Sequence, residues 1–129
     1  MLPLLAKIAV TLIALLHVYI LVREMFLWTT PRGRRAFGNS VEKAEATKVL
    51  AANQGLYNGF LAAGLFWGLS LGASGNPIKI FFLLCVIVAG LYGGFTASRK
   101  IIFIQAVPAA IAPGNACTKT ILRLAVMPP

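Results

Sequence analysis

Long apolar stretches, separated by short polar or glycine-rich turns, form the main pattern along the chain. Three of them cover residues 4–28, 49–78 and 80–98, and the second contains no charged residue. A helix needs about 20 residues to cross the hydrocarbon core of a bilayer, so each stretch is long enough. A fourth stretch begins at Ile101 and loses its apolar character beyond Ala112. The pattern predicts an all-α polytopic membrane protein, a four-transmembrane-helix bundle whose fourth helix is short or broken.

Helix-breaking residues set the predicted boundaries. The segment 29–40 holds Pro31 and two glycines and is predicted to be a loop. Asn39, followed three residues later by Glu42, is typical of a helix start, so the second helix should begin about two turns before its apolar stretch. The whole chain is therefore predicted to form one integral membrane domain over residues 1–129, with helices at about 2–28, 40–72, 77–98 and 99–112.

The C-terminal part departs from this pattern. A helix from Ile101 to Ala112 would span about 18 Å, which is short of a hydrocarbon core of about 30 Å. Pro108 should kink this helix, because proline lacks a backbone N–H. A Pro-Gly-Asn sequence follows Ala112 and breaks helices. Residues 113–129 are therefore predicted to be an irregular tail or a short helix lying in the outer interface.

Composition supports a membrane protein. Hydrophobic residues make up 59% of the chain and charged residues 12%, whereas soluble domains have about 45–50% and about 25%. No small-residue cleavage site follows the first apolar stretch, so we expect a retained span rather than a signal peptide. The two cysteines have neither the spacing nor the partners of a metal site, and no metal is expected.

The distribution of basic residues predicts the orientation. The chain has a net charge of +9, and Lys and Arg concentrate in the segments 29–48 and 99–100. Cytoplasmic loops of membrane proteins are enriched in these residues. Loops 29–40 and 99–100 should therefore be cytoplasmic, and the N-terminus should lie outside the cell (cytoplasmic) membrane. The basic residues should meet anionic lipid. They form no stripe with aromatic interleaving, so nucleic acid is not an expected partner.

Small residues recur at four-residue spacing within the apolar stretches. Such faces let two helices approach closely in lipid, so they predict packing surfaces and carry no information about function. The repeats are Gly55/Gly59, Gly64/Gly68/Gly72, Gly90/Gly94 and Gly93/Ala97.

Polar side chains inside the apolar stretches are costly in lipid, so each needs a reason. They are His17, Glu24, Asn53, Gln54, Tyr57, Asn58, Thr96 and Gln105. His17 and Glu24 share one helix face, about 10 Å apart along the axis. In the predicted topology Glu24, Asn53, Gln54, Thr96 and Gln105 lie toward the cytoplasmic ends of their helices, with His17, Tyr57 and Asn58 about one or two turns deeper. We therefore predict a polar pocket that opens to the cytosol or the inner leaflet.

Each polar residue also has a purely structural interpretation. Glu24 can be an interfacial residue paired with Arg23 or with an arginine of the first loop. The amides of Asn53, Gln54 and Asn58 can form hydrogen bonds between helices, each contributing about 0.6 kcal/mol. His17 can be a buried, hydrogen-bonded histidine, and haem ligation by it lacks support because the chain has no second histidine.

Two segments carry a resemblance to a known family. They read EMFLW at 24–28 with RGRRAFG at 32–38, and AEATKVLAANQGLYNGFLAAG at 44–64. They resemble the bacterial small integral membrane proteins catalogued as a domain of unknown function of the thirteen-hundreds series, sometimes labelled epimerase-like. The similarity extends to about Pro108. It implies four helices in the bacterial inner membrane and no established activity. The family's last span is unbroken and leucine-rich, whereas this chain departs from it after Ala112.

Three functions fit these features. The first is binding or conversion of a small lipophilic molecule, such as a quinone, a lipid-like metabolite or an isomerisable substrate. Glu24 would be the acid/base or charge partner and His17 a second proton carrier, whether or not the protein is an enzyme. The head group would be oriented by Asn53, Gln54, Tyr57, Asn58 and Gln105. The second function is proton-coupled export of lipophilic cations by a homodimer, and the third is a structural or assembly subunit. The sequence does not indicate a cofactor.

Overall fold

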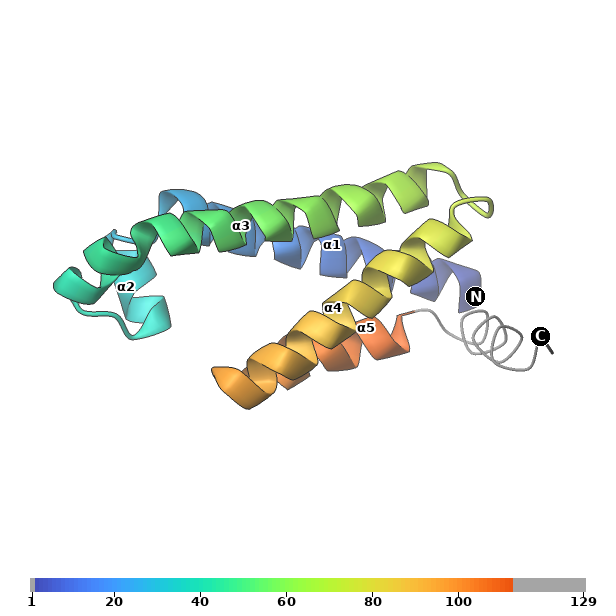
Figure 1. Ribbon diagram of the computed structural model, residues 1–129. Coiled ribbons are helices and arrows are strands. Elements are labelled where there is room, and N and C mark those ends of the chain that lie inside the picture. Colours follow the sequence, from blue (N-terminus) through green and yellow to red (C-terminus); the bar gives the residue numbers. More distant parts are fainter. Residues whose placement is uncertain (1, 113–129) are drawn as a thin grey trace, which may run out of the picture. The chain divides into compact units, whose positions relative to one another are not determined.

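The computed structural model describes residues 2–112, and every regular element within this range is helical (Figure 1). The predicted all-α class is therefore confirmed for this part of the chain. The elements are α1 (Leu2–Phe26), α2 (Pro31–Phe37), α3 (Val41–Ser70), α4 (Asn76–Thr96), the π-helix η1 (Ile102–Ala106) and α5 (Val107–Ile111). The predicted break and tail over 113–129 lie outside the described residues.

The segment 29–40 is not simply a loop, because it contains α2. Thr30 caps this helix by accepting a hydrogen bond from the Gly33 N–H at 3.1 Å, and Pro31 occupies its first turn. A proline there has its φ angle already set for a helix and needs no hydrogen-bond partner for the missing N–H. Gly38 ends α2 in the left-handed conformation, with φ 64°. The residues that were interpreted as breakers are thus the caps of a short helix.

The predicted cap of α3 is also corrected. Ser40, rather than Asn39, accepts from the backbone N–H of Lys43 through its hydroxyl, at 3.2 Å. Because α3 begins at Val41, Ser40 is the residue immediately before it and is the one placed to cap the first turn.

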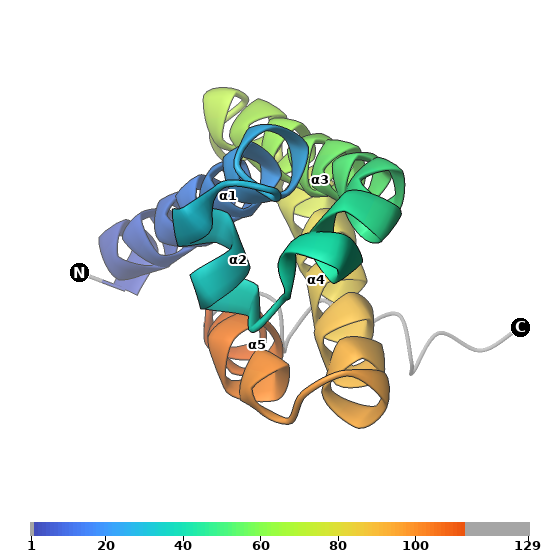
Figure 2. The ribbon, with the colours of Figure 1, turned by 90° about the vertical axis from the view of Figure 1, so that its left-hand side faces the viewer.

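By its internal contacts, the described chain divides into two compact units. One contains residues 14–63, and the other contains residues 2–13 and 64–112. In the 14–63 unit, the second half of α1 packs along α3 (Figure 2). A Cβ atom on Gly55 would lie 2.7 Å from the Met25 side chain and 3.1 Å from the Leu21 carbonyl oxygen. A larger residue would force these neighbours to shift, so the structure confirms the predicted packing role of Gly55.

In the other unit, α4 packs against the helix formed by η1 and α5. Gly90 and Gly94 face Ala106 and Ile102, and a Cβ atom on Gly90 would lie 2.9 Å from the Ala106 backbone nitrogen. Leu83 and other small or branched apolar residues are buried in this unit. The hairpin is therefore held by close van der Waals packing, as its small residues predicted.

A kink was predicted at Pro108, and the structure has a π-helical turn directly before this residue. The Val107 N–H donates to the carbonyl of Ile102, five residues back, at the end of η1. In a regular α-helix the Pro108 ring would clash with the carbonyl of Ile104 and leave it without a donor. The wider turn directly before Pro108 moves this backbone and lets helical structure continue to Ile111.

Two described helices are long and apolar enough to cross a membrane, Leu4–Phe26 and Asn76–Thr96, while Ile102–Ile111 is apolar but shorter. The 30-residue helix α3, whose apolar stretch 49–78 was predicted to span the membrane, is not among them. Its mean hydropathy is lowered by the charged residues of its first two turns and by the amides Asn53, Gln54 and Asn58. Four spans were predicted, and two of the described helices have the length and apolar composition of a span.

Candidate functional site

A carboxylate and an amide meet between α1 and α3, within the 14–63 unit. The Asn58 side-chain nitrogen donates to Glu24 Oε2 at 2.9 Å and to the backbone carbonyl of Gln54 at 3.0 Å. Glu24 is half-buried in the last turn of α1. The carboxylate reaches α3 because Gly55 has no side chain, and a Cβ atom there would lie 3.1 Å from Glu24 Cβ.

Glu24 has no cationic partner in residues 2–112, where the ion pair observed is Lys48–Glu45 at 2.9 Å. Its neighbour Arg23 instead donates to the Tyr19 hydroxyl and to the backbone carbonyl of Arg32. The structural interpretation of Glu24 as half of an interfacial ion pair therefore does not describe this arrangement.

The remaining polar residues of α3 do not all join this contact. Asn53 and Gln54 have exposed side chains, and Tyr57 is 52% exposed with its ring 6.2 Å from that of Phe60. The structure brings together Glu24, Asn58 and the Gln54 backbone. The wider set stays a prediction.

His17 and Gln105 have different surroundings. His17 lies two turns before Glu24 on α1 and is 1% exposed, which fits its structural interpretation as a buried histidine. Gln105 belongs to η1 in the other unit, where a Cβ atom on Gly90 would lie 3.1 Å from its Cβ. Its predicted role in a common pocket therefore stays a prediction as well.

The remaining atoms of the pair determine what it can do. Within the described residues, no protein hydrogen bond reaches Glu24 Oε1 or Asn58 Oδ1. These two oxygens can accept hydrogen bonds from a hydroxyl or amine, and the carboxylate can also take up and release a proton. The pair can therefore orient a polar head group and move one proton. Residues 2–112 contain no group of three or more His, Cys, Asp or Glu that could hold a metal.

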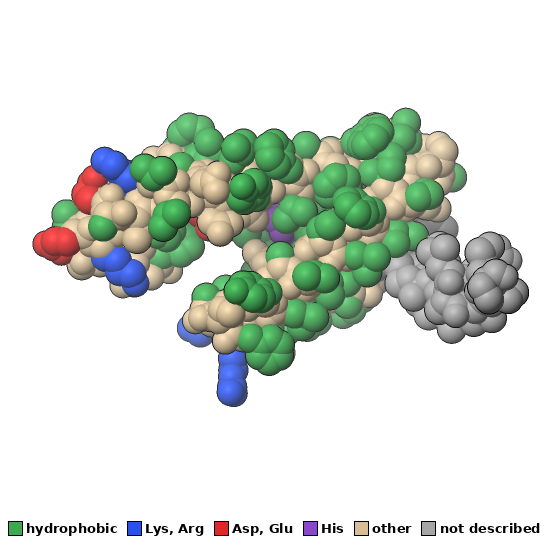
Figure 3. All heavy atoms as spheres, in the orientation of Figure 1, with side chains coloured by type: hydrophobic (Ala, Val, Ile, Leu, Met, Phe, Trp, Pro, Cys, Tyr) green, Lys and Arg blue, Asp and Glu red, His purple; other side chains and the backbone are tan. Residues whose placement is uncertain are grey.

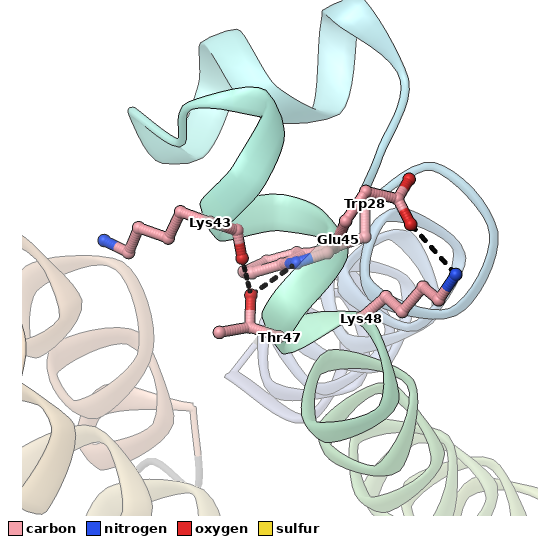
Figure 4. Close-up of polar contacts among 5 residues, drawn as sticks. All are labelled: Trp28, Lys43, Glu45, Thr47 and Lys48. Carbon is pink, nitrogen blue, oxygen red and sulfur yellow. Dashed lines mark hydrogen bonds and ion pairs between the residues drawn. The ribbon is translucent and has the colours of Figure 1, made fainter.

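A second polar contact between helices was not predicted from the sequence. Trp28 donates its indole N–H to the Thr47 hydroxyl at 3.0 Å, and this hydroxyl donates to the Lys43 carbonyl at 2.7 Å (Figure 4). Trp28 follows the end of α1, so this hydrogen bond ties that end to the first turns of α3. Its pairing with a threonine 19 residues later has no signal in the sequence pattern.

Apolar side chains dominate the exposed surface of the helices. Figure 3 shows hydrophobic side chains along the length of α4, and Lys and Arg side chains at the turn that follows it. The exposed residues include Phe81, Val88, Tyr92 and Phe95, and Phe95 is 83% exposed. Such continuous apolar exposure is typical of a surface that faces lipid or another protein.

Comparison with known proteins identifies a family, but the matching proteins carry no described activity. A family described as "Protein of unknown function (DUF1304)" matches residues 11–115. The chain is similar to the uncharacterized protein YpaA of Lactococcus lactis subsp. lactis (strain IL1403), with 33% identity over 96 residues that cover 73% of this chain and 81% of the relative. No solved structure matches the chain.

Proposed function

The chain belongs to the DUF1304 family of proteins of unknown function, and from its own residues we propose that it is an integral membrane protein that binds or converts a small lipophilic molecule. The observation that carries this proposal is the hydrogen bond between Glu24 and Asn58. A carboxylate at this depth, without a cationic partner in the described residues, is costly in lipid and is typical of a functional site.

The helices support the membrane part of the proposal. The apolar windows of Leu4–Phe26 and Asn76–Thr96 are each only 22% buried within the protein. A core helix of a soluble domain would be mostly buried, so these helices need lipid or another apolar partner. We propose that α3 also crosses the membrane and that the η1–α5 helix enters it as the short fourth helix of the bundle. Loops 29–40 and 99–100 would then face the cytoplasm.

The site chemistry suggests a ligand with one polar head group on an apolar body. A hydroxyl of this head group would donate to Glu24 Oε1 or Asn58 Oδ1, while the body would lie against apolar helix surfaces. If the ligand is isomerised, Glu24 is the residue placed to act as acid and base, with His17 as the second proton carrier. Asn53, Gln54, Tyr57 and Gln105 would complete the predicted pocket.

The two alternative functions fit the geometry differently. A coupling carboxylate of an exporter belongs near the middle of the membrane, whereas Glu24 lies two residues before the end of α1. A structural subunit is favoured by the exposed amides of Asn53 and Gln54, which could bond to a partner helix.

The test is mass spectrometry of small molecules retained by gently purified protein. We expect one lipophilic compound to be enriched with the wild-type chain and lost with Glu24→Gln and with Asn58→Leu. Glu45→Gln is the matched control, because Glu45 is exposed and pairs only with Lys48. Equal retention by all four proteins, or retention of bulk lipid alone, would overturn the proposal.

Orientation can be tested separately with single cysteines at positions 39 and 76, in a chain that lacks Cys85 and Cys117. An impermeant thiol reagent should label position 76 from outside intact cells and position 39 only after the cells are opened. Outside labelling at position 39 would reverse the proposed topology without affecting the ligand site.

A further inference from the structure

Arg23 is a cation without an anion. Its guanidinium donates to the Tyr19 hydroxyl at 2.9 Å and to the Arg32 carbonyl at 3.2 Å, and its Nε is buried with no hydrogen-bond partner. The guanidinium carbon lies 5.5 Å from the centre of the Tyr19 ring and 5.8 Å from that of Phe37. No carboxylate of residues 2–112 pairs with it, because the ion pair there is formed by two other residues.

Helix α2 is fixed beside this arginine. Gly33 packs so closely on the Leu27 carbonyl that a Cβ atom would overlap it, and Arg34 Nε donates to the Thr29 carbonyl at 3.2 Å. These contacts hold α2 against the end of α1. The side chains of Arg32 and Arg35 stay exposed.

The α1–α2 junction, defined as Tyr19, Arg23, Arg32, Arg35 and Phe37, therefore combines three guanidinium groups with two aromatic rings. Guanidinium groups bind phosphate oxygens in a forked geometry, and Tyr and Arg are both enriched where a helix leaves the membrane. The junction lies at the end of α1, where a spanning helix would meet lipid head groups. Its surplus positive charge complements an anionic surface.

We propose that the α1–α2 junction binds the phosphate group of an anionic phospholipid. The phosphate would bridge Arg23 and the exposed arginines of α2, and the lipid chains would extend along α1 beside Tyr19. The inference depends on membrane insertion but not on the Glu24–Asn58 site, which uses a different side of α1. Insertion is checked by extraction: a protein released from membranes by alkaline wash would end both proposals together.

The experiment is native mass spectrometry of the full chain in nonionic detergent, titrated with phosphatidylglycerol or phosphatidylcholine. We expect phosphatidylglycerol to bind at least about 5-fold more tightly, and each removed arginine to weaken its binding about 5-fold. The test variant is Arg32→Gln/Arg35→Gln, whose side chains are exposed and should not be needed for folding. The matched control is Arg99→Gln/Lys100→Gln, which removes the same charge from an exposed turn.

The proposal requires that the test pair loses the preference for phosphatidylglycerol and that the control pair keeps it. Equal losses would show a diffuse charge effect and would overturn a defined site, as would equal binding of the two lipids. Displacement of the lipid by millimolar inorganic phosphate would reassign the junction to a soluble anion. Arg23→Lys provides an internal check. It keeps the positive charge but loses the forked guanidinium group, so it should also weaken the binding of phosphatidylglycerol.

Discussion

In the described part of the chain, both compact units contain a pair of helices packed closely at glycines, but only one of these helix contacts also contains a hydrogen-bonded carboxylate. In both, glycines let a pair of helices approach until backbone meets backbone or side-chain stem, at Gly55 in the 14–63 unit and at Gly90 in the other. Between α4 and the η1–α5 helix the contact is then filled by Ala106 and Ile102. Between α1 and α3 it also contains the hydrogen bond of Glu24 with Asn58.

This difference separates scaffold from site. Close packing of small residues is sufficient to associate helices in lipid, and the α4 hairpin is packed in this way. A carboxylate is not needed for that purpose and carries a desolvation cost, so its presence in one helix pair and not in the other supports the chemical role proposed for Glu24. Mutations should accordingly affect stability most in the apolar hairpin and affect ligand retention most at Glu24 and Asn58.

The largest effect on stability is expected for Gly90→Val. A side chain at this position meets the Ala106 backbone nitrogen, which cannot move aside as a side chain can. Overpacking of this kind destabilises by about 1–3 kcal/mol. The free energy of unfolding, measured by titration with SDS in mixed micelles, should fall by that amount.

Gly93→Val is the control for this prediction. Its nearest neighbours are side-chain atoms of Ile101 at 3.3 and 3.4 Å, which can shift. It introduces the same residue into the same helix, so helix propensity cancels in the comparison. Equal stability of the two variants would contradict the close packing of Gly90 on the Ala106 backbone.

The next effect is expected for Thr47→Val, which removes the acceptor of the Trp28 indole N–H. One hydrogen bond contributes about 1 kcal/mol, so unfolding should become easier by about this much. Thr96→Val is a matched control, because both threonines donate to a carbonyl four residues back and only Thr47 also joins two helices. A similar loss in both variants would mean that the contact between Trp28 and Thr47 does not stabilise the 14–63 unit.

These contacts show what the sequence could and could not predict. The apolar stretches predicted α1, α3 and α4 to within a few residues, because long hydrophobic runs dominate local preference. Helix α2 was missed because a seven-residue helix depends on its caps, and Pro31 and Gly38 are equally typical of a loop.

The sequence predicted that Glu24 would lie near polar residues of α3, but it did not predict which of them pairs with it. Which of them meets Glu24 depends on the rotation of α3 about its axis, and that rotation is set by the packing of Gly55 and Gly59 on α1. Asn58 follows Gly55 by three residues and therefore faces the same neighbour, whereas Asn53 does not.

Asn58→Leu should separate stability from function. Hydrogen bonds between helices in membranes contribute about 0.6 kcal/mol, so the free energy of unfolding should change by less than in the two variants above. Retention of the lipophilic ligand should nevertheless be lost. Asn53→Leu is the control, because Asn53 is exposed and the amide that bonds to Glu24 is that of Asn58. A large loss of stability together with unchanged retention would instead assign Asn58 to the scaffold.

The smallest effect concerns Glu42, outside the apolar part of α3. Its own backbone N–H and then the Ser40 hydroxyl stabilise the charged carboxylate at the helix start, and they hold the pKa of Glu42 below its usual value of about 4.3. A carboxylate whose folded pKa is lowered stabilises the fold above the unfolded pKa, and this contribution is lost as the pH falls through the folded pKa. The midpoint of the Glu42 carboxyl carbon signal in an NMR titration should therefore lie below that of a model peptide. Ser40→Ala should raise the midpoint only part of the way, because the larger backbone contribution remains. An unchanged midpoint in Ser40→Ala would show that Ser40 caps the backbone of α3 without acting on the Glu42 carboxylate.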